Sequence, residues 1–117
     1  MHHPMAIIIK TDNPNLLLDK IYEGLASRKV EKWTVIPDGR ITPSPLLWKN
    51  EAFLKPQIWV EESELRFGLI KRKDRKYITS KLYTYFHVKF VEMLLANFET
   101  DFKEVTVTAF STPPDNF

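Results

Sequence analysis

The chain has 117 residues, of which 44% are hydrophobic and 27% charged, and its formal net charge is +2. This size and composition predict one globular domain with a sizeable core, and they exclude a wholly disordered chain. The absence of cysteine excludes disulfide bridges, zinc–thiolate centres and thiol nucleophiles, and it favours a reducing compartment.

The sequence shows no signal for a membrane or a secretory route. No stretch approaches the roughly 20 apolar residues of a membrane-spanning helix. The apolar run over residues 5–9 is too short for the core of a signal peptide. We therefore expect a cytoplasmic protein with no membrane partner, folded as a single domain over residues 1–117, with flexible ends at 1–4 and 111–117.

The first elements in chain order are a strand and a helix. Three successive isoleucines follow Ala6, and because they do not alternate with polar residues they predict a strand buried on both faces. Asn13 and Pro14 then indicate a helix start, since Asn caps helices well and Pro fits the first helical position. Apolar residues continue at helical spacing to Leu25, so this helix should end near Ser27.

Strands are predicted through the middle of the chain. Residues 33–36 and 40–42 flank a turn with the sequence Pro-Asp-Gly, which presets one φ angle and accepts a positive one. Residues 57–61 and 64–72 flank the polar pair Glu62-Ser63, which predicts a hairpin. Residues 46–56 lack a clean period, and we interpret them as a packed loop or a short helical turn, with a strand from Ala52 as the alternative.

A second helix and a last strand complete the predicted order. Residues 81–97 carry an apolar stripe at helical spacing, and residues 103–110 alternate as a strand does. The order is therefore β-α-β-β-β-β-α-β. It predicts a two-layer α+β sandwich, in which two helices cover one face of a mainly antiparallel sheet of about five or six strands.

Aromatic residues between positions 46 and 60 are the strongest candidates for an interaction surface. The chain holds three Trp, eight Phe and four Tyr, more rings than a core of this size needs. We predict that Trp33 fills the core, whereas Trp48, Phe53 and Trp59 offer a surface for a protein partner or a second copy. A dimer formed through a sheet edge is one form of that interaction.

A basic run offers an alternative function. Residues 71–76 carry five positive charges and one negative charge, so the rest of the chain sums to −2. Lysine and arginine on one surface contact phosphates, which makes Arg72, Lys73, Arg75 and Lys76 the candidates for nucleic-acid binding. The competing interpretation is a solvated turn that guards a sheet edge.

Catalysis and metal binding have weaker support. His87 and Tyr83 share a helix face four residues apart and are the candidates for an acid–base site, but no nucleophile accompanies them. Glu61, Glu62 and Glu64 cluster at a hairpin end, where adjacent strand residues point apart and converge poorly on a cation. With Met1 retained and unblocked, the pair His2 and His3 offers the nitrogen donors that suit Cu²⁺ or Ni²⁺, a property of any such terminus that we do not interpret as a function.

The sequence therefore predicts a binding protein more readily than an enzyme. It contains three glycines and no phosphate-binding loop, dinucleotide fingerprint or HExxH motif. We expect no metal and no cofactor. The leading hypothesis is a non-catalytic protein-interaction domain; nucleic-acid binding through residues 71–76 is the alternative, and a small-molecule site or enzyme near His87 is the third.

Overall fold

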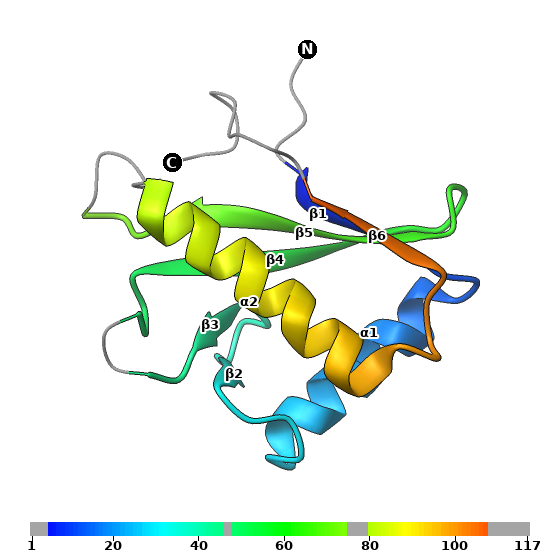
Figure 1. The fold of residues 1–117 in the computed structure, drawn as a ribbon, viewed down its shortest axis with the longest axis horizontal. Coiled ribbons are helices and arrows are strands. Elements are labelled where there is room, and N and C mark those ends of the chain that lie inside the picture. Colours follow the sequence, from blue (N-terminus) through cyan, green and yellow to red (C-terminus); the bar gives the residue numbers. More distant parts are fainter. Residues whose placement is uncertain (1–4, 46–47, 75–79, 108–117) are drawn as a thin grey trace.

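One antiparallel sheet and two helices form the fold of the described chain (Figure 1). This computed structural model describes residues 5–45, 48–74 and 80–107. The elements, in order, are β1 (Met5–Lys10), α1 (Pro14–Ala26), β2 (Trp33–Val35), β3 (Ile41–Pro43), β4 (Ala52–Trp59), β5 (Glu64–Lys71), α2 (Ser80–Phe98) and β6 (Glu104–Val107). The predicted α+β class and element order are confirmed. The predictions for residues 1–4 and 111–117, and for His2 and His3, lie outside the described residues.

The sheet has the strand order β2-β3-β4-β5-β1-β6, and each neighbouring pair is antiparallel. The first and last strands therefore pair with each other, and β1 lies between β5 and β6. The register sets Ile7 opposite Phe67 and Ile9 opposite Leu65, which brings these four side chains to one face.

Only one face of β1 is fully buried. Ile7 and Ile9 have no exposed surface, whereas Ile8 is half-buried on the other face of the sheet. The prediction of a strand buried on both faces was therefore only partly correct. Three isoleucines in a row satisfy either arrangement, and the outcome depends on both helices packing against the same face.

An aromatic cluster holds α2 on the sheet. The ring of Trp33 in β2 makes edge contacts with Phe86 and Phe90 of α2, at centroid distances of 5.9 and 5.1 Å. Phe90 in turn lies 4.7 Å from Phe67 in β5. All four side chains are buried, as expected for Trp33. Edge-to-face packing of this kind fixes ring orientation as well as burying apolar area.

The helix α1 packs beside the carboxyl-terminal end of α2 (Figure 1). It begins as predicted, because the Asn13 side chain accepts a hydrogen bond from the Leu16 backbone N–H at 3.0 Å. A Cβ added to Gly24 would lie 2.9 Å from Cγ2 of Val30 and 3.3 Å from the Phe98 ring. Gly24 therefore allows a close approach that any larger residue would obstruct. No helix among the described residues combines the length and apolar character that a membrane span requires.

The strand β4 begins earlier than the main sequence interpretation placed it. It runs from Ala52, which was the alternative, because it pairs with β5 along its whole length, from Ala52 opposite Lys71 to Trp59 opposite Glu64. Pro56 is tolerated because β3 pairs with β4 only at Leu54, so no second strand needs the missing N–H. Long-range pairing thus overrides a local sequence without a clean period.

A charged network lies on the sheet face opposite the helices. Glu64 is only 4% exposed, and its carboxylate forms ion pairs with Lys10 and with Arg66, whose Nε donates at 2.7 Å. The Arg66 guanidinium also lies 3.8 Å above the Trp59 ring. Hydrogen bonding by Lys10, followed by that from Arg66, lowers the pKa of Glu64 against the opposing effect of burial.

The lowered pKa predicts a pH-dependent stability contribution from Glu64. This stabilisation is complete above the ordinary glutamate pKa and is lost as the pH falls through the lowered pKa of the folded state. Near pH 7, Glu64→Gln should reduce the free energy of unfolding by about 1 kcal/mol. The difference should vanish in acid, where Glu64 is also neutral. Urea denaturation of both proteins across pH tests this, with the exposed Glu62→Gln as the control; equal stabilities near pH 7 would contradict it.

Candidate binding groove along the second helix

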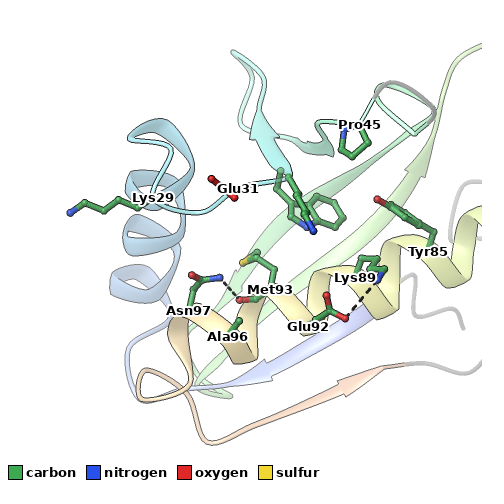
Figure 2. Close-up of a pocket in the computed structure, with 11 residues that line it drawn as sticks. Lys29, Glu31, Pro45, Tyr85, Lys89, Glu92, Met93, Ala96 and Asn97 are labelled. Atoms are coloured by element: carbon green, nitrogen blue, oxygen red, sulfur yellow. Dashed lines mark hydrogen bonds and ion pairs between the residues drawn. The ribbon is translucent and has the colours of Figure 1, made fainter.

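A hollow of about 510 Å³ lies between α2, the segment that joins α1 to β2, and Pro45 (Figure 2). Trp33 and Met93, both buried, line its inner side. Ala96 and Asn97 line it farther along α2, and the Asn97 Nδ2 donates to the Met93 carbonyl at 2.9 Å. The hollow therefore has an apolar floor that belongs to the core of the protein.

Charged side chains line the outer part of this hollow. Lys29, Lys32 and Lys89 are exposed, and they are accompanied by Glu31 and Glu92; the Lys29 side chain points away from the hollow (Figure 2). The Lys89 Nζ lies 3.7 Å from a Glu92 carboxylate oxygen, a loose ion pair at the surface (Figure 2). We call this first hollow the cationic compartment.

A second hollow, of about 500 Å³, adjoins the first along α2. Its main feature is Trp48, whose ring stacks on Tyr85 at a centroid distance of 4.2 Å and an interplanar angle of 14°. Val88, Thr84, Lys81 and Lys89 complete its lining. We call it the aromatic compartment.

A tight turn presents Trp48 to α2. The Trp48 N–H donates to the Pro45 carbonyl at 3.0 Å, and the Glu51 N–H donates to the Trp48 carbonyl at 3.2 Å. Pro45 disfavours regular structure at this point, so the segment leaves β3 and turns back before β4 begins. The turn holds the indole against Tyr85 at the surface, where Trp48 is only partly buried.

The two compartments form one groove, because Tyr85 and Lys89 line both. We refer to the cationic and aromatic compartments together as the α2 groove. Its lining includes four lysines, Lys29, Lys32, Lys81 and Lys89, against two glutamates, Glu31 and Glu92, and of the lysines Lys29 directs its ammonium group away from the groove (Figure 2). A net positive rim beside stacked rings suits a ligand that carries an apolar group close to negative charge.

The structure separates the three aromatic residues that the sequence grouped together. Trp48 lies against α2, whereas Phe53 and Trp59 alternate along β4 with the core residue Leu54 and therefore face away from the helices. An arginine lies over each of these two rings. The Cζ of Arg40 is 4.3 Å from the centroid of the Phe53 ring, and the Cζ of Arg66 is 3.8 Å from the centroid of the Trp59 ring. Of the three, only Trp48 belongs to the groove.

The basic run is partly neutralised where the structure describes it. Arg72 forms ion pairs with Glu51 at 3.2 Å and with Asp74 at 2.8 Å, and Lys73 is exposed. Arg75 and Lys76 lie outside the described residues. Nucleic-acid binding through these four residues stays a prediction.

His87 belongs to the buried stripe of α2. It is 2% exposed, its Nδ1 donates to the Tyr83 carbonyl at 2.6 Å, and the two rings stack at 3.9 Å. This contact with the preceding helical turn fixes the ring within the helix. Neither His87 nor Tyr83 lines the α2 groove, and an acid–base role for them stays a prediction.

The acidic hairpin end divides into two parts. Glu61 and Glu62 are exposed, whereas Glu64 is buried and forms ion pairs with Lys10 and Arg66. Across residues 5–45, 48–74 and 80–107, no group of three or more histidine, cysteine, aspartate or glutamate side chains is placed to hold a metal ion.

Most of the groove was missed by sequence reasoning. Tyr85, Lys89 and Met93 recur every four residues and so share one flank of α2, a signal that was available. Lys29 and Lys32 carry no such signal, because only the chain path after α1 brings them to the same hollow. Comparison with known proteins adds nothing to this assignment: no family model, curated protein or solved structure matches the chain.

The two tryptophans near the groove should differ sharply in their contribution to stability. Trp48→Ala removes a surface stack and should lower the free energy of unfolding by about 1 kcal/mol. Trp33→Ala leaves a cavity in the core beneath α2 and should lower the free energy of unfolding by about 3–5 kcal/mol. Chemical denaturation of both variants measures the difference. Equal losses would mean that Trp48 is a core residue and that the aromatic compartment is not an accessible surface.

Proposed function

We propose that this chain is a non-catalytic protein-interaction domain that binds an acidic segment of a partner protein in the α2 groove. The observation that carries the proposal is the Trp48–Tyr85 stack, which forms an apolar surface directly beside exposed lysines. Binding would be driven by burial of an apolar side chain of the partner. The charges of the lysines would determine the direction in which the partner segment lies along the groove.

The aromatic compartment supplies the anchor site. Trp48, Tyr85 and Val88 give it an apolar surface beside Thr84 and two lysines, and Val88 is 55% exposed in the isolated chain. Tryptophan and tyrosine are the residues most enriched at interface hot spots, because a rigid ring buries a large area at a small cost in entropy. An apolar partner side chain placed here would displace water from these rings.

The lysines supply the preference for an acidic partner. Lys81 and Lys89 border the aromatic compartment, and Lys29 and Lys32 border the cationic one. Opposing charges at an interface accelerate encounter and select the partner more than they add affinity. A segment with carboxylates on either side of an apolar anchor would therefore fit this groove, and a basic segment would be rejected.

The groove is pre-formed by the core and needs little rearrangement. Tyr85 packs against Phe86 at a centroid distance of 6.3 Å, and Phe86 contacts Trp33 in the aromatic cluster. A rigid surface loses less entropy on binding than a mobile one.

The test is a titration with short synthetic peptides that lack tryptophan, so that Trp48 reports binding through its fluorescence. One peptide carries a central Leu-Phe pair flanked by glutamates, and its control carries lysines in their place. We expect saturable binding of the acidic peptide alone. Lys89→Glu should weaken it about tenfold, since the change reverses a charge at the centre of the groove.

Two further variants separate binding from folding and from the alternative function. Trp59→Ala, on the opposite sheet face, should leave binding unchanged, while Trp48→Ala should abolish it when followed by calorimetry. Equal affinity for both peptides would contradict the proposal. Salt-sensitive binding of an oligonucleotide, lost on reversing Arg72, Lys73, Arg75 and Lys76, would favour the nucleic-acid alternative instead.

A further inference from the structure

The outer face of α2 carries a seam of residues at regular spacing, all of them exposed except the half-buried Tyr85. The seam lies opposite the buried stripe that contains Phe86, Phe90 and Leu94. Two of its apolar members are well exposed, Val88 at 55% and Leu95 at 48%. The seam consists of Lys81, Tyr85, Val88, Glu92, Leu95 and Glu99.

This spacing is the one by which helices pair. Successive seam residues alternate between four and three positions apart, as the two inner positions of a heptad do. A solvent-facing stripe of an isolated helix is ordinarily polar. Here Tyr85, Val88 and Leu95 place apolar groups within the stripe, with Glu92 between Val88 and Leu95 and one charged residue at each end.

The charges at the two ends oppose the dipole of α2 itself. Lys81 lies in the first turn, and Glu99 follows the last helical residue. The first turn holds no acidic residue, and the last turn holds no basic one. A helix dipole favours the reverse arrangement, so these charges are better placed for a neighbouring helix than for α2 alone.

We propose that a second copy of the chain docks on this seam with its α2 antiparallel. A two-fold axis beside the middle of the helix would place Lys81 opposite Glu99 of the second copy, and Tyr85 opposite its Leu95. Val88 would lie opposite Glu92 of the second copy. Every contact occurs twice, and each end pairs opposite charges, so the ends of the seam are complementary to each other, whereas the central contact sets Val88 against a carboxylate that needs a cation beside it.

The middle of the seam supports the same arrangement. Within one chain, Lys89 and Glu92 form only a loose surface pair at 3.7 Å. In the antiparallel pair, Lys89 would lie next to Glu92 of the second copy. The ion pair within one chain would therefore be replaced by an equivalent ion pair between the two chains. The proposal goes beyond the peptide-binding function, because Leu95 and Glu99 lie outside the groove, although the other four seam residues also line it and a second copy would compete with a peptide there.

The experiment is sedimentation velocity of the full chain over a range of protein concentrations. We expect a monomer–dimer equilibrium that Leu95→Glu abolishes. Lys81→Glu and Glu99→Lys, made singly, should each raise the dissociation constant about tenfold, since each turns two attractive contacts into repulsive ones. The double variant should recover the dimer, because both contacts are attractive again. Lys55→Glu, on the opposite sheet face, is the matched control.

Two results would overturn the antiparallel dimer. A protein that stays monomeric at every concentration excludes it. A dimer that tolerates Leu95→Glu, or that the charge-reversed double variant does not restore, associates through another surface such as a sheet edge. A dimer through the seam would cover Lys81, Tyr85, Val88 and Glu92, which also line the α2 groove. The peptide titration is therefore repeated on the monomeric Leu95→Glu protein, which retains the groove and its Trp48 signal, so that failure of one proposal is distinguished from failure of the other.

Discussion

The contact between Trp33 and the rings of α2 determines the arrangement on which the other features depend. Trp33 meets Phe86 and Phe90 edge-on, and Phe90 reaches Phe67 in the centre of the sheet. These contacts bind a short, three-residue strand to a long helix that is distant in sequence. They fix not only where α2 lies but also its rotation about its own axis, because ring edges and faces pack in few orientations.

That rotation gives α2 a buried face, a flank that lines the groove, and an outer seam that shares Lys81, Tyr85, Val88 and Glu92 with the groove lining. One face, with Phe86, Phe90 and Leu94, is buried in the core. One flank, with Tyr85, Lys89 and Met93, completes the groove to which Trp48 and Trp33 contribute from other segments. The outer seam is left to solvent, although two of its residues, Val88 and Leu95, are apolar. The proposed partner segment and the proposed second copy thus use surfaces that one packing constraint creates.

The sequence predicted what depends on local pattern and missed what depends on the chain path. The Asn13–Pro14 start signal and the apolar stripe of α2 placed both helices, because caps and periodicity act within a few residues. The start of β4 was less clear, since its pairing with β5 is not a local property. Trp48 was identified as a surface residue, but its partner Tyr85 was not, because their stacking joins segments that only the tertiary fold brings together.

The central claim is that the α2 groove is the surface that binds a partner. The most direct test is to follow the backbone amide resonances of the protein while the acidic peptide is added. The account predicts shifts in residues 29–33, in Trp48 and along 81–97, with little change in β4 and β5. Shifts concentrated at Phe53, Trp59 and Arg66 would contradict it, because the binding surface would then be the opposite face of the sheet.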